Sequence, residues 1–152
     1  MKNELTVKAI EKGTVIDHID AKKLFKIISI LGIENIDSEV FIGNNLDSKK
    51  HNKKAIIKIS QKYLSIEDIN KIAIIDTHAV INIIDGYKVI EKKQVQLPES
   101  INSFVKCINP KCITNNEQVA TKFKVQKNGE KVNLKCYYCE KITNQDNIEI
   151  IR

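Results

Sequence analysis

The sequence predicts an α+β protein with two domains, an N-terminal domain over residues 1–96 and a smaller all-β domain over residues 97–152. Two observations lead to this division. In the first part, short β-branched segments alternate with two segments of helical periodicity, whereas the second part has short strand-like segments and all four cysteines. A chain of 152 residues is long enough for one domain of about 100 residues and a small appendage.

The first elements expected are a strand and a helix. Residues 14–19 form a short segment rich in β-branched residues that follows Gly13, which indicates a strand. A helix is expected over residues 21–31, with Asp20 as its N-terminal cap and Gly32 at its end. The apolar stripe of this helix, which would face the core of the domain, consists of Leu24, Phe25, Ile27, Ile28 and Leu31.

Two strands and a second helix come next. The strands are expected over residues 39–44 and 55–60, joined by a polar loop over residues 45–53. Ser65, with Asp68 three residues later, indicates a capping box at the start of the helix. The apolar stripe of this helix would consist of Ile66, Ile69, Ile72 and Ala73.

The N-terminal domain is expected to end in a hairpin. Residues 79–84 and 87–90 have strand character, and Asp85-Gly86 between them is a strong hairpin signal. The resulting order is β-α-β-β-α-β with one extra strand. This order predicts a ferredoxin-like arrangement, in which two helices cover one face of an antiparallel sheet.

A break in periodicity over residues 92–100, which include Pro98, predicts the boundary after residue 96. A turn is expected at Asn128-Gly129. The strands predicted beyond the boundary are residues 123–125, 134–136 and 148–150.

The four cysteines form two short-spaced pairs. Four residues separate Cys107 from Cys112, and two separate Cys136 from Cys139. Two such pairs on separate loops are what a tetrahedral zinc ion requires, and four thiolates would close its coordination shell. We therefore expect one structural zinc ion per chain, in a C-terminal all-β zinc-binding domain that it helps to fold. Free or disulfide-forming cysteines and a catalytic zinc ion remain as alternatives.

The composition excludes several classes of protein. With 42% hydrophobic and 29% charged residues, the chain resembles an ordinary globular protein, and its longest apolar runs are far shorter than the roughly 20 residues that span a bilayer. Residues 1–5 lack the apolar core of a signal peptide, so the cytoplasm is the expected location. The formal charge of +6 divides evenly between the two parts, and Arg152 is the only arginine. A dedicated nucleic-acid-binding protein usually concentrates basic residues and favours arginine.

The N-terminal domain lacks familiar catalytic and phosphate-binding patterns. The chain contains no GxxxxGKS/T, GxGxxG, GxSxG or HExxH sequence. It does place polar side chains on otherwise apolar strands, and Lys92 after the last of these strands, where they would lie on the sheet face that the helices leave open. The simpler interpretation is that they are the solvent-facing residues of alternating strands. These residues are Asp17, His18, Lys58, Asn82 and Lys92.

Five segments together resemble one known family. They are residues 13–19, 57–59, 79–89, 97–99 and 134–141. In content and order these segments are similar to the regulatory chain of aspartate carbamoyltransferase, and the likeness extends over nearly the whole chain. The combination of GTVIDHI with this cysteine spacing is much more specific than either feature alone.

The resemblance implies a non-catalytic chain that acts in pyrimidine biosynthesis. Such a chain would pair with itself through the N-terminal domain and dock its zinc domain on a separate catalytic chain. CTP would inhibit and ATP would activate through one allosteric site on the N-terminal domain. By position, the effector site would comprise Ala9, Ile10, Val15, Asp17, His18, Lys58, Asn82, Ile84, Tyr87, Val89 and Lys92. The zinc ligands would be Cys107, Cys112, Cys136 and Cys139.

One alternative function comes from a different class. A basic chain with a four-cysteine ribbon is also typical of zinc-ribbon nucleic-acid-binding proteins. Such a protein would bind oligonucleotides with steep salt dependence, whereas a regulatory chain would bind free CTP or ATP and co-purify with its catalytic partner. We expect the regulatory chain, with neither nucleic acid nor membrane as a partner.

Overall fold

A computed structural model describes residues 9–49 and 53–151. Residues 1–5 and the centre of the polar loop predicted over residues 45–53 lie outside these ranges. The chain divides into two compact units, Met1–Gln96 and Leu97–Arg152. In the described parts of both units, every helix is too short or too polar to cross a membrane.

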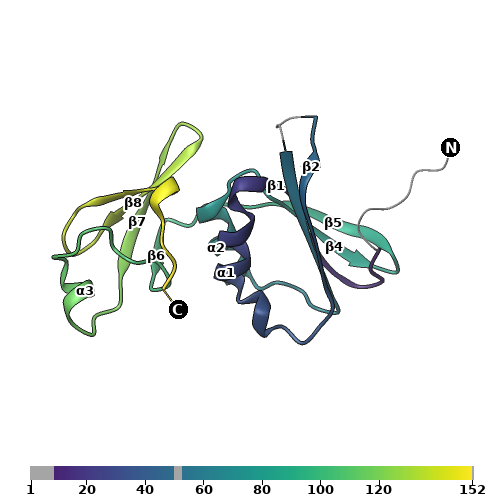
Figure 1. Ribbon diagram of the computed structural model, residues 1–152, viewed down its shortest axis with the longest axis horizontal. Coiled ribbons are helices and arrows are strands. Elements are labelled where there is room, and N and C mark those ends of the chain that lie inside the picture. The colour runs from purple at the N-terminus through teal and green to yellow at the C-terminus, as the bar shows by residue number, and fades with distance from the viewer. Residues whose placement is uncertain (1–8, 50–52, 152) are drawn as a thin grey trace. The chain divides into compact units, whose positions relative to one another are not determined.

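The first unit is a five-stranded antiparallel sheet with two helices on one of its faces (Figure 1). This arrangement confirms the predicted α+β, ferredoxin-like fold. The strand order is β2-β3-β1-β4-β5, so β5 is the extra strand and extends the sheet beyond β4. The strands are β1 (Gly13–Asp20), β2 (Val40–Asp47), β3 (Lys53–Ser60), β4 (Val80–Asp85) and β5 (Lys88–Gln94). The helices are α1 (Leu24–Leu31) and α2 (Ile66–Ile75), with short 3-10 turns η1 (Ala21–Lys23) and η2 (Ile33–Asn35).

The predicted signals at the helix ends are confirmed. The Ser65 hydroxyl accepts a hydrogen bond from Asp68 N, and the Asp68 carboxylate accepts one from Ser65 N, which completes the capping box of α2. Asp20 caps η1 by accepting from the backbone N–H of Lys22, and Gly32 ends α1. The first helical segment thus begins with a 3-10 turn.

The core of this unit lies between the helices and the sheet. Ile16, Ile57 and Ile81 are fully buried neighbours on β1, β3 and β4. The prediction that Phe25 and Ile66 face the core is wrong, because their side chains are 71% and 77% exposed. Phe25 lies at the edge of a narrow buried stripe, and Ile66 lies in the first turn of α2, which buries only its C-terminal half. The residues these helices bury are Leu24, Ile27, Ile30, Ile72, Ala73, Ile74 and Ile75.

The hairpin between β4 and β5 is present, but its turn lies one residue later than predicted. Asp85 pairs with Lys88, so Gly86 and Tyr87 are the two central residues, and both have positive φ angles, as a type I′ turn requires. Lys92 was expected after the last strand. It lies inside β5 instead, opposite Asn82 of β4.

The second unit is a four-stranded antiparallel sheet with the order β6-β7-β8-β9, around a core that includes Phe123 and Leu134. The predicted strand over residues 148–150 is wrong, because that segment makes only an isolated bridge between Val105 and Ile150. The sequence did not predict β6 or β9, which are three residues long and too short to show a period. The elements are β6 (Ser100–Asn102), α3 (Ile113–Asn116), β7 (Lys122–Asn128), β8 (Lys131–Cys136), β9 (Ile142–Asn144) and a 3-10 turn η3 (Gln145–Asn147).

Candidate metal and effector sites

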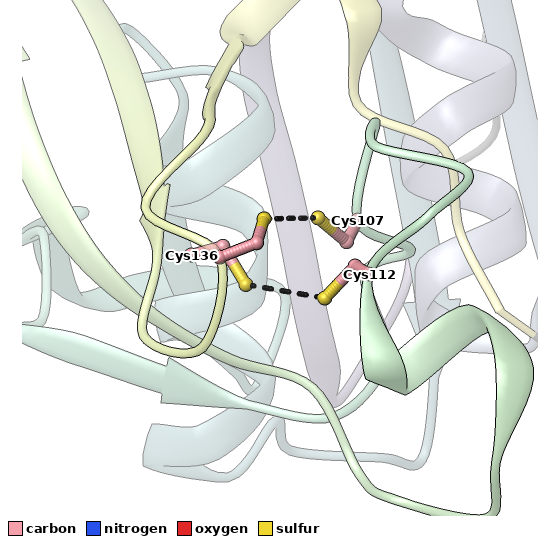
Figure 2. A group of neighbouring side chains, drawn as sticks. Cys107, Cys112 and Cys136 are labelled. Carbon is pink, nitrogen blue, oxygen red and sulfur yellow. Dashed lines mark hydrogen bonds between the residues drawn. The ribbon is translucent and has the colours of Figure 1, made fainter.

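The four cysteines meet at one point of the second unit. Cys107 and Cys112 flank the loop before α3, Cys136 ends β8, and Cys139 lies in the turn that follows. Their Sγ atoms all lie within 4.8 Å of one another, and the sulfurs from the two loops face each other (Figure 2). The Cys107–Cys139 and Cys112–Cys136 sulfur pairs are 3.6 and 3.7 Å apart.

These separations fit a metal ion better than a disulfide. Four sulfurs placed tetrahedrally about 2.3 Å from one ion lie about 3.8 Å from each other, whereas a disulfide bond is about 2.05 Å long. All four cysteines are free. The cluster therefore has the ligand set and spacing of a bound metal ion.

The protonation chemistry of the cluster also fits a cation. Cys107 and Cys136 are almost fully buried, and burial raises the pKa of both thiols. At Cys139 burial opposes ionisation, but hydrogen bonds from Lys141, Asn109 and neighbouring thiols outweigh it and lower the pKa to about 7. Grouping four thiolates in a buried place requires a compensating positive charge, which a divalent metal ion supplies.

Side chains of α3 contact the first cysteine loop, although none of them was a predicted site residue. Thr114 donates a hydrogen bond to the Cys112 sulfur, and the amides of Asn115 and Asn116 donate to carbonyl oxygens of the loop. The only sequence signal was a run of hydrogen-bonding side chains directly after a candidate ligand.

The candidate effector residues of the first unit are organised by strand pairing. Val15 on β1 pairs with Lys58 on β3 and with Asn82 on β4, and Asn82 pairs with Lys92 on β5. Directly paired residues of antiparallel strands point to the same face of a sheet. The fully buried neighbours of Val15 in β1 face the helices, so this cross-strand row lies on the opposite face.

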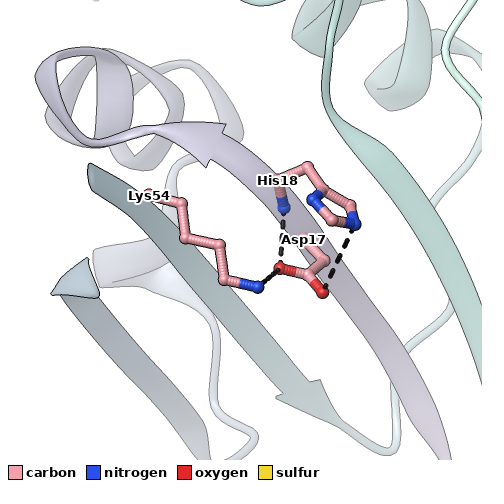
Figure 3. Close-up of polar contacts among 3 residues, drawn as sticks. All are labelled: Asp17, His18 and Lys54. Atoms are coloured by element: carbon pink, nitrogen blue, oxygen red, sulfur yellow. Dashed lines mark hydrogen bonds and ion pairs between the residues drawn. The ribbon is translucent and has the colours of Figure 1, made fainter. Parts of the chain in front are cut away.

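Asp17 and His18 lie at one end of this face, where the pairing of β1 with β3 shifts register. The Asp17 carboxylate accepts hydrogen bonds from His18 N at 2.7 Å and from Lys54 Nζ at 3.1 Å (Figure 3). Both side chains of the Asp17–Lys54 ion pair are more than three-quarters buried. Lys54 was not among the predicted site residues, although its two-residue steps from Ile56 and Lys58 place all three on one face of β3.

The segment before β1 lies against the same region. Ile10 forms a buried apolar cluster with Val15 and Ile84. The backbone N–H of Tyr87 donates to the carbonyl of Glu11 at 3.0 Å, which ties the β4–β5 turn to this segment. Two further predicted residues belong to this region: Ala9 is the neighbour of Ile10 in the chain, and Val89 pairs with Ile84.

Both units match described families. Residues 5–96 match the aspartate carbamoyltransferase regulatory chain, allosteric domain, and residues 99–149 match the aspartate carbamoyltransferase regulatory chain, metal binding domain. An aspartate carbamoyltransferase regulatory chain of Bacteroides fragilis is 49% identical over 150 residues, covering 99% of this chain and 97% of the relative. The corresponding protein of Pyrococcus horikoshii is 48% identical over 148 residues, covering 95% and 96%.

These matches extend over both units and favour the regulatory chain over the zinc-ribbon nucleic-acid-binding alternative. The four-cysteine cluster lies inside the part that matches a metal binding domain, which agrees with its geometry. The chain therefore belongs to the family of aspartate carbamoyltransferase regulatory chains and is a regulatory rather than a catalytic chain.

Proposed function

We propose that this chain binds CTP and ATP on the open face of its first unit, holds one zinc ion in its second unit, and controls a separate catalytic chain. The observation that carries the proposal is the cross-strand row of Lys58, Val15, Asn82 and Lys92. Strand pairing places these four residues, which are distant in sequence, side by side on one face of the sheet, with a lysine at each end of the row.

The row suits a triphosphate. Lys58 and Lys92 are three strand spacings apart, about 14 Å between their backbones. Two flexible side chains at this distance can converge on phosphates placed between them, near Asn82. Lysine acts on phosphate as a point charge, so it tolerates the shifts that different nucleotides would require.

The base and ribose would lie toward the segment before β1. Backbone groups of Ala9 and Ile10, and of Tyr87 to Val89, offer hydrogen-bond donors and acceptors for a base edge. The Tyr87–Glu11 hydrogen bond supports this assignment because it keeps the two backbone segments adjacent. Asp17 and His18 supply the remaining polar groups, with Lys54 holding the carboxylate in place.

Opposite responses to CTP and ATP require two states of the assembly. A ligand shifts an equilibrium only by its difference in affinity for the two states, so CTP and ATP must favour different states from one shared site. CTP is assigned the inhibitory role and ATP the activating role. The two nucleotides differ in their base, so the protein groups that contact the base decide whether binding inhibits or activates the catalytic chain.

The second unit would hold one zinc ion through Cys107, Cys112, Cys136 and Cys139. Four thiolates close the tetrahedral shell and leave no position for a substrate, which assigns the ion a structural role. This unit has few fully buried side chains, so metal binding would contribute directly to its folding free energy.

The partner is a catalytic chain that joins carbamoyl phosphate to aspartate in pyrimidine biosynthesis, in the cytoplasm. The zinc unit would dock on that chain, and the first unit would pair with its copy in a second regulatory chain. Co-expression with the catalytic chain tests this directly. Co-purification and an aspartate saturation curve that CTP and ATP shift in opposite directions are expected, whereas separate elution of the two chains would contradict the proposal.

Replacing Lys58 with Ala tests the effector site. A charge-assisted hydrogen bond contributes about 1.5–3 kcal/mol, so the Kd for CTP should rise about 10- to 150-fold. Calorimetry with CTP and with ATP measures the change. Lys22→Ala, which removes an exposed lysine of η1, is the matched control and should bind both nucleotides normally. Unchanged binding in Lys58→Ala would remove this residue from the site.

A further inference from the structure

The two cysteine pairs are carried by loops of different kinds. Cys136 ends a strand, and main-chain hydrogen bonds from Cys136 N to Lys141 O and from Glu140 N to Cys136 O close the turn beyond it. Cys107 and Cys112 instead flank residues 108–111, which belong to no helix or strand and have exposed or half-buried side chains; within this loop, Cys112 N donates a main-chain hydrogen bond to Asn109 O. An irregular loop of this kind loses more conformational entropy when it is fixed, so it needs other support.

Two asparagine amides supply this support. Asn115 Nδ2 donates to Cys107 O at 3.0 Å and to Asn109 O at 2.7 Å. Asn116 Nδ2 donates to Pro110 O at 3.0 Å and to Cys112 O at 2.8 Å. A side-chain NH2 group has two donors, and both amides use both of theirs on this loop.

A hydroxyl group of the same helix reaches a sulfur. Thr114 Oγ1 donates to Cys112 Sγ at 3.2 Å. Groups that hydrogen-bond to a metal ligand orient it and tune its basicity, and their loss typically weakens metal binding about 10- to 100-fold. The three consecutive side chains of α3 therefore act on the carbonyl groups of both ligands and on one ligand sulfur.

We propose that Thr114, Asn115 and Asn116 are positioning residues that hold Cys107 and Cys112 in the metal-binding arrangement. The inference rests on the proposed zinc site and adds that its two cysteine pairs are supported in different ways. The first cysteine pair depends on a side-chain clamp, and the second pair on its strand and turn. Without these side-chain hydrogen bonds from α3, Cys107 and Cys112 would dissociate from the metal before Cys136 and Cys139.

The test uses the full zinc-loaded chain with Asn115→Ala and Asn115→Asp. The aspartate keeps the size of asparagine but, when ionised, faces two carbonyl oxygens without a donor. Zinc release into excess chromophoric chelator is expected to be about 10-fold faster or more in both variants. Asn147→Ala removes an exposed asparagine of η3 from the same unit and serves as the control.

A second readout separates positioning from a general loss of folding. Trypsin cleaves after Lys106, Lys111 and Lys141, so alkylated cysteines of the two pairs are recovered on different peptides. In Asn115→Ala under chelator challenge, Cys107 and Cys112 should be alkylated ahead of Cys136 and Cys139. A milder variant, Thr114→Val, should speed alkylation of Cys112 without unfolding the unit.

Three results would overturn the inference. Zinc release in both Asn115 variants at the rate of Asn147→Ala would show that the clamp does not hold the ligands. Simultaneous alkylation of all four cysteines would reduce the role of Asn115 to general stability. Failure of the unaltered chain to bind zinc would overturn the proposed metal site as well, so the two failures are distinguishable.

Discussion

The buried carboxylate of Asp76 provides a sharp test of how the first unit is held together. Asp76 is fully buried at the end of α2. Its two oxygens accept hydrogen bonds from Asp20 N and from His78 N, each at 2.8 Å. The side chain thus joins the end of β1, two residues after His18, to the turn that leads into β4. Replacing it with Ala would leave two backbone N–H groups without their acceptor.

The cost of Asp76→Ala follows from these contacts. A hydrogen bond to a charged group is worth about 1.5–3 kcal/mol, so two give about 3–6 kcal/mol. Removing a buried charge also removes its desolvation penalty, which reduces the net loss to about 2–4 kcal/mol. For a unit of residues 1–96, with an unfolding entropy of about 0.2 kcal/mol/K, the melting temperature should fall by about 10–20 °C.

Scanning calorimetry of the zinc-loaded chain measures the shift, and hydrogen exchange of peptides from the first unit assigns the transition. Asp76→Asn keeps one acceptor and should lose about half as much. Asp37→Ala removes an exposed carboxylate and should change stability by less than about 0.5 kcal/mol. A melting temperature of Asp76→Ala equal to that of Asp37→Ala would show that the two hydrogen bonds do not contribute to stability.

Two further predictions concern the backbone of the first unit and the metal of the second. Gly13→Ala should destabilise the first unit by several kcal/mol, since φ is +139° and an added Cβ would collide with the carbonyl oxygen of Ile59; a denaturation midpoint equal to that of the unaltered chain would contradict this. Stripping the metal with a strong chelator should unfold residues 97–152 and leave the first unit folded. Hydrogen exchange resolved by unit is the measurement, and full protection of both units after metal removal would exclude a folding role for the ion.

Local sequence patterns predicted the order of the elements well. The capping box at Ser65 and the helix end at Gly32 involve residues within one turn of each other, so no distant contact was needed to predict them. The exposed side chains of Phe25 and Ile66 show the limit of this approach. Helical periodicity identifies an apolar stripe, but the extent of the sheet beneath it decides which part is buried.

The hairpin turns show a second limit. The dipeptides Asp85-Gly86 and Asn128-Gly129 correctly indicated turns. In both hairpins, however, strand pairing places the glycine first among the two central residues, because Asp85 pairs with Lys88 and Asn128 pairs with Lys131. Register is set by the packing of a whole strand, and a one-residue shift is invisible in the dipeptide.

The metal-type cluster of four cysteines could be predicted from the sequence, because each pair is close along the chain and a tetrahedral ion accepts few arrangements of its ligands. The fold was needed to find which residues lie across from Val15, that Lys54 contacts Asp17, and that the Asn115 amide donates to Cys107 O. These contacts join segments through strand register or through the fold of an irregular loop. Both result from the packing of the whole unit, and no local pattern specifies them.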